Sequence, residues 1–307
     1  CAPRSTRRAS IAWWVRCSMA AQYTCCFAGR DVRITPPMTT PTSIYDLPVS
    51  DFMSMPVLAI HPDAELSDAE RRMEETGVSC LAVMGAGDEL LGVISRTDIL
   101  RVGRLRAQMA SDAHLLTMPH QTVRQRMVAD VISVDPDAPL RLAATLMLQH
   151  RIHRVFVVDA GLAVGVVSTR DLMRAVMEER TQSPISRWMS QPVIAVPATE
   201  TVAQATDRLG ETHVRGVVVL EEEWPVGVFT QSEALAAAHL DPSTPVEEVM
   251  SCALLCLPLG MPIHRAAAFA VETRARRVLA VEARDLRGIL SGLDMARVVA
   301  GDPDLRR

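Results

Sequence analysis

The chain has 307 residues, 49% of them apolar, so it is long enough to bury the cores of two ordinary domains. Its formal net charge is −4, and its basic residues other than histidine are all arginine, with no lysine anywhere. This composition excludes mechanisms that need a lysine, such as a phosphate-binding loop with its lysine or a Schiff-base enzyme.

The first 37 residues differ from the rest in charge. They carry six arginines against one acidic residue, Asp31, so their net charge is about +5 and that of residues 38–307 about −9. An acidic body disfavours binding to a nucleic-acid backbone, and we predict no nucleic-acid partner.

We interpret residues 1–44 as a disordered or non-native leader, with translation starting at Met38 or Met19. A targeting segment is the alternative.

Neither a membrane span nor a metal site is predicted. The apolar run at 11–15 is far too short to cross a bilayer, and so is every later apolar run. Cys80, Cys252 and Cys256 lie within apolar runs and form no paired C-x-x-C pattern. We therefore expect them to be reduced core residues of a cytoplasmic protein.

Two short motifs recur along the chain at a constant distance. The pattern V-x-x-x-M-x-x-x-V, with some Ile or Leu ends, spans 49–57, 123–131, 185–193 and 246–254. Its methionines are Met53, Met127, Met189 and Met250. A glycine, two apolar residues, a hydroxyl residue, two variable residues and a carboxylate begin at Gly92, Gly165, Gly227 and Gly288. Each glycine follows its methionine by 38 or 39 residues, which indicates four tandem repeats.

Between these motifs the pattern predicts strand, helix, strand, turn, strand and helix. In the second repeat, 131–134 is extended, and a helix carries one apolar stripe, Leu140, Ala143, Ala144, Met147 and Leu148. Strands at 155–158 and 163–167 flank a turn at 159–161, and Asp171 opens the second helix. Turns in the other repeats are expected at 85–88, 221–225 and 283–285, and a surface loop at 110–121.

With these motifs the sequence resembles the cystathionine-beta-synthase (CBS) domain family over residues 45–302. The resemblance implies an α+β fold of β-α-β-β-α repeats, in which consecutive repeats form a pseudo-symmetric pair called a Bateman module. The first pair is then 45–180, with repeats at 45–110 and 122–180. The second is 181–302, with repeats at 181–240 and 242–302, and 303–307 is a tail. The nucleotide-sensing gamma subunit of AMP-activated protein kinase, also four repeats, is the functional parallel.

Four carboxylates occupy the same position of the repeat. They are Asp98, Asp171, Glu233 and Asp294. A carboxylate can accept hydrogen bonds from both hydroxyls of a ribose, which would make these residues ligand-binding. The alternative is that each merely caps the helix that it begins.

Hydroxyl and basic residues accompany the carboxylates. The hydroxyl residues are Ser95, Thr97, Ser168, Thr230, Ser232 and Ser291. They stand where a strand leads into a helix N-terminus, a location that suits phosphate. His153 and Arg154 resemble the family's phosphate-contacting basic pair, and Arg276 and Arg277 correspond to them in the fourth repeat. Arg170, beside Asp171, would add a further charge-assisted bond. The alternative is a solvated surface charge for each arginine and a satisfied edge histidine for His153.

Other positions depart from this pattern or are equivocal. The first repeat has Ser79 and Cys80 where the basic pair is expected, and the third has Arg215 and Gly216, which puts its pocket in doubt. The apolar residues that begin the first strands would wall an adenine ring or simply fill the core. They are Val57, Val131, Val193 and Leu254.

The leading hypothesis is a non-catalytic regulatory sensor that needs no cofactor. It binds AMP, ADP, ATP or S-adenosylmethionine in clefts between paired repeats, shifts the arrangement of the two modules and so alters an effector protein. The alternative is a degenerate scaffold that associates without nucleotide. An enzyme is disfavoured because no nucleophile elbow or metal-ligand spacing occurs. A homodimer, or pairing of the two modules within one chain, is expected.

Overall fold

The computed structural model describes residues 43–109, 120–212 and 214–302. The predictions for the leader up to residue 42, for the loop at 110–119 and for the tail lie outside these residues.

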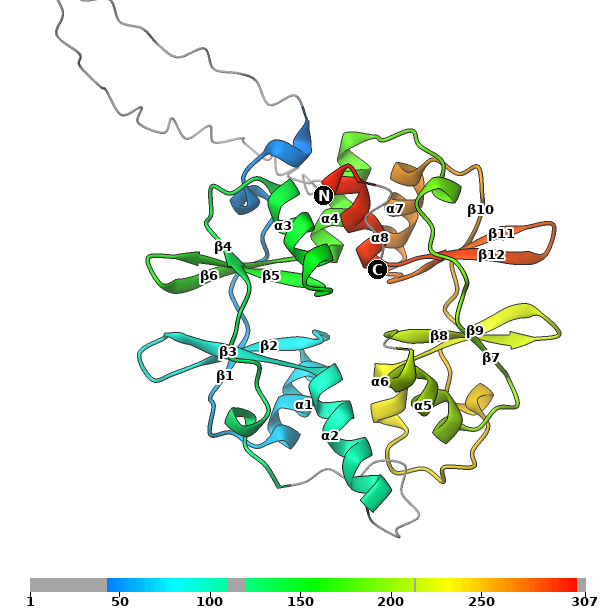
Figure 1. Cartoon of the computed structure of the whole chain (residues 1–307), viewed down its shortest axis with the longest axis horizontal. Coiled ribbons are helices and arrows are strands. Elements are labelled where there is room, and N and C mark those ends of the chain that lie inside the picture. The colour runs from blue at the N-terminus through cyan, green and yellow to red at the C-terminus, as the bar shows by residue number, and fades with distance from the viewer. Residues whose placement is uncertain (1–42, 110–119, 213, 303–307) are drawn as a thin grey trace, which may run out of the picture. The chain divides into compact units, whose positions relative to one another are not determined.

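The described chain contains four units with the same order of elements (Figure 1). Unit one consists of β1 (Ala59–Ile60), α1 (Leu66–Glu75), β2 (Cys80–Met84), β3 (Leu90–Ser95) and α2 (Arg96–Met109). Unit two consists of β4 (Ser133–Val134), α3 (Leu140–Gln149), β5 (Arg154–Asp159), β6 (Leu162–Ser168) and α4 (Thr169–Glu179). Unit three consists of β7 (Ala195–Pro197), α5 (Val202–Glu211), β8 (Gly216–Glu221), β9 (Trp224–Thr230) and α6 (Gln231–Ala236). Unit four consists of β10 (Cys256–Pro258), α7 (Ile263–Glu272), β11 (Val278–Glu282), β12 (Asp285–Leu290) and α8 (Gly292–Ala300).

Each unit forms a three-stranded mixed sheet. The first strand pairs in parallel with the second, and the second pairs antiparallel with the third, so the second strand is central. In units two and four, two residues with positive φ turn the hairpin, Ala160 and Gly161 in the former and Ala283 and Arg284 in the latter. Such turns match the twist of the flanking strands. The predicted α+β fold is confirmed, with turns at the predicted places.

The positions where the helices start confirm one prediction and correct another. Helix α3 carries the predicted apolar stripe and begins at Leu140, after Pro139. Asp171 does not open α4, because the helix begins two residues earlier and Ser168 is its N-cap. Asp171 is the third helical residue, and its Oδ2 accepts hydrogen bonds from the Ser168 N–H (2.8 Å) and Oγ (2.6 Å). This reciprocal capping box needs the carboxylate one turn into the helix.

A short 3-10 helix precedes each unit and packs on the neighbouring unit of its pair. These helices are η1 (Ile44–Asp46) and η2 (Val49–Asp51) for unit one, η3 (Val123–Gln125) for unit two, η4 (Ile185–Arg187) for unit three and η5 (Val246–Glu248) for unit four. We call residues 44–58, 121–132, 183–194 and 244–255 the crossing segments. The Val49 N–H donates to the Ala138 carbonyl (2.8 Å), and the Val123 N–H to that of Ala64 (2.8 Å). Units one and two therefore exchange their leading segments, as do units three and four.

The motif methionines lie against glycines of the other unit in the same pair. A Cβ atom at Gly227 would lie 2.8 Å from Cγ of Met250, closer than real Cβ atoms approach a neighbour. The other pairs are Met53 with Gly165, Met127 with Gly92 and Met189 with Gly288. The two sequence motifs therefore meet between units and not within one. Glycine is needed there so that the methionine can reach the strand.

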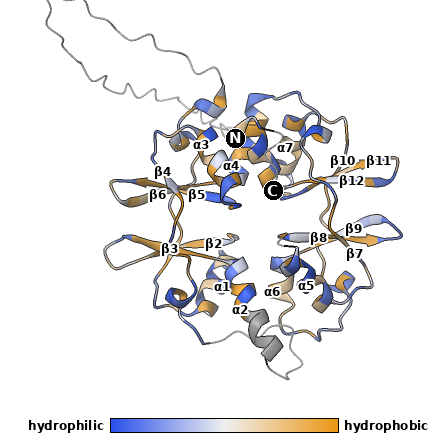
Figure 2. Ribbon diagram, in the orientation of Figure 1, coloured by the Kyte–Doolittle hydropathy of each residue, from blue (hydrophilic) through white to orange (hydrophobic). Residues whose placement is uncertain are grey.

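Two large hydrophobic cores each join units from different pairs. One contains buried residues of units two and four, where α3 and α4 pack against α7 and α8 (Figure 1). The other contains those of units one and three, where α2 contacts α6. A smaller cluster around Cys80, Ala82 and Phe156 joins the sheets of units one and two. Figure 2 shows hydrophobic residues concentrated on the strands and on one side of the helices.

The three cysteines that the structure describes, Cys80, Cys252 and Cys256, do not share one environment. All three are free thiols, and Cys80 is buried as predicted. The prediction that Cys252 is a core residue was wrong, because it is exposed in the irregular part of a crossing segment, between η5 and β10. None of the helices that the structure describes has the length and apolar character needed to cross a membrane.

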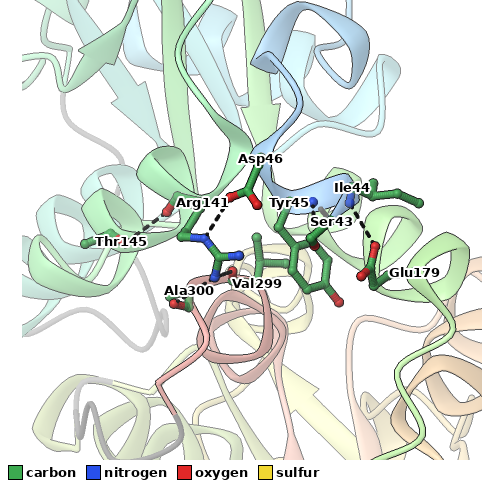
Figure 3. Close-up of polar contacts among 9 residues, drawn as sticks. All are labelled: Ser43, Ile44, Tyr45, Asp46, Arg141, Thr145, Glu179, Val299 and Ala300. Carbon is green, nitrogen blue, oxygen red and sulfur yellow. Dashed lines mark hydrogen bonds and ion pairs between the residues drawn. The ribbon is translucent and has the colours of Figure 1, made fainter. Parts of the chain in front are cut away.

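Tyr45 fastens the first crossing segment to units two and four (Figure 3). Its ring is buried, its hydroxyl lies 3.0 Å from Thr181 Oγ1, and the Arg141 guanidinium lies 5.8 Å from its ring centroid. Arg141 also donates to Asp46 (3.1 Å) and to the carbonyls of Val299 and Ala300 at the end of α8. Burial raises the pKa of Tyr45 to about 12, although the Thr181 hydrogen bond lowers it.

We expect Tyr45 to ionise about two pH units later than an exposed tyrosine. Its raised pKa means that its contribution to stability is present below pH ~10, where the unfolded tyrosine is still neutral, and is lost as pH rises to ~12. The chain has two tyrosines, Tyr23 and Tyr45, so tyrosinate absorbance against pH should lose its late transition in Tyr45→Phe and keep it in Tyr23→Phe. Ionisation of both near pH ~10, with a native circular dichroism spectrum, would contradict this.

Candidate functional site

All four units contribute side chains to one cavity. Its volume is about 1360 Å³, and it is lined by the ends of strands, the starts of helices and parts of the crossing segments. Ten arginines line it, against three carboxylates, Asp171, Glu211 and Glu233. The arginines are Arg96, Arg101, Arg151, Arg154, Arg170, Arg174, Arg215, Arg274, Arg276 and Arg277. Such an excess of one sign in a concave site attracts anions.

Equivalent positions of the four units meet at this cavity. Just before or at the start of each central strand lie Ser79 and Cys80, His153 and Arg154, Arg215 and Gly216, and Arg276 and Arg277. Arg154 Nη2 donates to Ser79 Oγ across the first pair (2.6 Å). In the second pair the Arg277 guanidinium lies over Gly216, where a Cβ would be 2.7 Å from Cζ. The missing side chain at Gly216 thus makes room for an arginine of unit four.

Burial and, after it, mutual repulsion lower the pKa of two arginines in the cavity. Burial, together with repulsion from Arg154 and Arg277, lowers the pKa of Arg215 to about 10, against attraction from the Cys80 and Asp98 side chains. Burial also lowers the pKa of Arg276, with repulsion from Arg96, Arg170 and Arg154. Arg215 remains cationic at pH 7. These guanidinium groups repel one another within the cavity, and a bound anion would relieve that repulsion.

Helix N-termini add further positive potential. The first turns of α2, α4 and α8 line the cavity through Thr97, Thr169 and Gly292. Thr97 Oγ1 donates to Gln231 Oε1 (3.0 Å) across units one and three. The unpaired N–H groups of a helix's first turn and the helix dipole favour anions, which reinforces the arginines.

The four motif carboxylates all act as helix caps in this structure. Asp98, Glu233 and Asp294 accept hydrogen bonds from the residue before their helix, as Asp171 does. Asp171 and Asp294 are buried, and Asp294 Oδ1 also accepts from Ser190 Oγ (2.6 Å) and from Arg297. The capping alternative therefore describes these contacts, whereas the ribose-binding role stays a prediction.

The structure brings most of the predicted site residues to the cavity. Those that line it are Thr97, His153, Arg154, Ser168, Arg170, Asp171, Thr230, Ser232, Glu233, Arg276, Arg277 and Ser291. Ser95, Asp98 and Asp294 are not among its lining residues. Of the apolar candidates, Val193 and Leu254 line it, whereas Val57 and Val131 pack between the sheets of the first pair.

Sequence reasoning missed Arg96 and undervalued Arg215. Arg96 precedes Thr97 in the same motif, and its Nη1 donates to Ser232 Oγ of unit three (2.6 Å). Arg215 stands one place before Gly216, the same position that His153 occupies in unit two. Aligning the four motifs by position alone, and accepting any cation, would have found both.

Replacing Arg215 with methionine should raise stability and weaken anion binding at the same time. The change removes a half-buried charge that its neighbours repel, which we expect to add about 1 kcal/mol after discounting for solvent screening. Loss of one charge-assisted contact should lower phosphate affinity about tenfold. Thermal unfolding and phosphate titration measure the two effects, and Arg71→Met, which removes an exposed arginine, is the matched control. A lower melting temperature in Arg215→Met would contradict this mutual repulsion.

The family model described as "CBS domain" matches residues 49–104, 123–178 and 185–240, more than half of the chain. The chain belongs to the CBS domain family. Unit four is not within these ranges, but it has the same order of strands and helices as the three CBS units.

Curated relatives share only part of their length with this CBS protein. An uncharacterized protein of Methanocaldococcus jannaschii is 23% identical over 274 residues, which are 82% of this chain and 62% of that protein. The chain thus spans less than two thirds of that relative. An inosine-5'-monophosphate dehydrogenase of Korarchaeum cryptofilum is 28% identical over 122 residues, 39% of this chain and 22% of the enzyme.

Two solved structures share the fold over most of the CBS chain. A Methanocaldococcus jannaschii protein described as a candidate archaeal homologue of g-AMPK has a TM-score of 0.71 at 18% identity, covering 82% of this chain and 99% of its own. An uncharacterized conserved protein from Pyrococcus horikoshii has a TM-score of 0.60 at 21% identity, covering 82% and 100%. At these identities the likeness establishes the fold alone.

Proposed function

We propose that the chain is a regulatory sensor of four CBS repeats, with unit four as the fourth repeat, arranged as the pairs 45–180 and 181–302. It binds adenosine-containing ligands between paired repeats, with their phosphate groups in the arginine-lined cavity. The observation that carries this proposal is the meeting of equivalent positions from all four units, with ten arginines, at one cavity. A structural core would not collect like charges in this way, because their repulsion destabilises the fold.

The crossing segments place both units of a pair at each site. Ser54 of the first crossing segment lies 3.5 Å from Asp171 of unit two, and Ser190 donates to Asp294 of unit four. A nucleoside bound beside the helix start would contact both units, and its phosphate would reach the cavity shared by the two pairs. Unit two offers the most complete set of predicted ligand-binding residues, since all of them line the cavity: His153, Arg154, Ser168, Arg170 and Asp171. Binding would favour one arrangement of the pairs and so signal to an effector.

A scaffold that binds no nucleotide is the second candidate. Its support is the burial of Asp171 and Asp294, whose carboxylates already cap their helices. A ribose would have to displace or share those hydrogen bonds. On this alternative the family motif is kept for the fold, and the chain acts through protein contacts alone.

Thermal unfolding of the full chain with AMP, ADP, ATP and S-adenosylmethionine separates the two candidates. A ligand at 100 times its Kd adds about 2.7 kcal/mol, a shift of several degrees. We expect a shift with at least one ligand, lost in Arg154→Gln and kept in Arg71→Gln. Absence of any shift across the panel would reject the sensor in favour of the scaffold.

A further inference from the structure

The cavity carries more positive charge than one mononucleotide can neutralise. Its ten arginines exceed its three carboxylates by seven charges. A terminal phosphate contributes about −2, so a monophosphate leaves most of this excess uncompensated. Pockets for drug-sized ligands have volumes of roughly 300–1000 Å³, whereas this cavity measures about 1360 Å³.

The excess charge is shared between the two pairs and is not divided into separate sites. Repulsion from Arg154 of the first pair lowers the pKa of Arg215 and of Arg276 in the second pair. Repulsion from Arg96 and Arg170 of the first pair also lowers the pKa of Arg276. Contacts also cross between the pairs, since Arg96 Nη1 donates to Ser232 Oγ and Arg276 lies 3.5 Å from the Gly77 carbonyl. An anion placed among these side chains would interact with both pairs at once.

Two of these cations have no partner of their own. The guanidinium groups of Arg170 and Arg215 make no hydrogen bond or ion pair with any other residue in the part of the chain that the structure describes. Because Arg170 belongs to the first pair and Arg215 to the second, guanidinium groups with no partner among the described residues line the cavity from both pairs. Arginine's planar fork suits phosphate oxygens, and several forks in a row suit a chain of phosphates.

Resting on the proposed function of the same cavity, we propose that it binds one chain of three or more linked phosphates that bridges the two pairs. This chain of phosphates is part of either a nucleoside polyphosphate or inorganic polyphosphate. Each further phosphate neutralises arginines of the opposite pair, so affinity increases with chain length. The bound anion then ties the pairs together, because neither pair alone offers the whole row of cations.

Isothermal titration calorimetry of the full chain with pyrophosphate, tripolyphosphate and tetrapolyphosphate tests this. We expect one molecule bound per chain and an affinity at least tenfold higher for tripolyphosphate than for pyrophosphate, as two or more added charge-assisted bonds imply. Affinity should fall with rising salt. Equal affinity for all lengths, or two or more molecules bound independently, would overturn the proposal.

Variants on opposite sides of the cavity test the bridging. Arg154→Gln in the first pair and Arg277→Gln in the second should each weaken tripolyphosphate binding about tenfold, the value of one charge-assisted contact. Arg71→Gln, which neutralises an exposed arginine of α1, should leave affinity unchanged. Loss of affinity in only one of the two cavity variants would show a site within one pair and overturn the bridge.

Adenosine tetraphosphate compared with inorganic tetraphosphate identifies the source and separates the two proposals. Tighter binding of the adenosine compound supports both the nucleoside source and the sensor function. Equal binding keeps the bridge, assigns it to inorganic polyphosphate and rejects the adenosine sensor. Binding of AMP without any gain from longer chains keeps the sensor and rejects the bridge.

Discussion

Residues 43–182, produced without the second pair, should form dimers in solution and not folded monomers. In the whole chain the apolar faces of α3 and α4 pack against α7 and α8 in one continuous core. Removing units three and four would expose those faces, at about 25 cal/mol for each Å² of apolar surface. A second copy offers a matching surface, because units two and four have the same order of elements.

Light scattering after size-exclusion chromatography measures this directly. We expect the mass of a dimer at micromolar concentration, and a single complex with residues 183–302 when the two fragments are mixed. The full chain at the same concentration is the control, since its cores are already complete. A monomeric fragment that unfolds cooperatively at the melting temperature of the full chain would show that the first pair is self-sufficient.

Adding one methyl group at Gly92 should destabilise the protein by about 2 kcal/mol, as overpacking of a tight contact does. A Cβ at Gly92 would lie 2.8 Å from the Val128 carbonyl oxygen and 3.0 Å from Met127 Sδ. That carbonyl accepts a hydrogen bond from the Val93 N–H (2.9 Å), so it cannot retreat without breaking the contact between units one and two. Denaturant unfolding of Gly92→Ala measures the loss.

The effect of the equivalent change at Gly165 should depend on Met53, because the three atoms nearest to its Cβ position all belong to that side chain. Gly165→Ala should cost about 1 kcal/mol alone, and less when Met53→Ala has removed the crowding side chain. Met127→Ala should not rescue Gly92→Ala, since the Val128 backbone remains. Gly260→Ala, where a Cβ meets nothing within 4 Å, is the neutral control. Equal costs at all three glycines would contradict this account.

The repeat motifs predict the elements of the fold well, but not which units touch. Met53 and Gly92 stand 39 residues apart, and that spacing suggests a contact within one repeat. The structure instead places Met53 on Gly165 and Met127 on Gly92. Because every repeat carries the same motif, sequence periodicity is identical for both arrangements. Only the backbone bonds of the crossing segments, such as that from Val49 to Ala138, distinguish them.

The candidate site was predictable to a similar extent. The resemblance to the family indicated Arg154 and Arg277, and its place beside Asp171 indicated Arg170. All three line the cavity. Arg215 was undervalued because Gly216 takes the second place of the expected basic pair, so the pair looked incomplete. The role of Gly216 is visible only when Arg277 of another unit fills the space above it. Contacts between distant repeats leave no spacing signal in one sequence.

The crossing segments also limit how such a protein can change over evolutionary time. Each unit of a pair packs a methionine onto the other, since Met53 lies against Gly165 in a strand of unit two and Met127 against Gly92 in a strand of unit one. A gene duplication that adds a single unit would leave one methionine without its glycine and one strand uncovered. An ancestral single-repeat chain could have formed this arrangement only as a swapped dimer, before fusion of two gene copies fixed it. Lineages of this architecture should therefore gain and lose repeats two at a time.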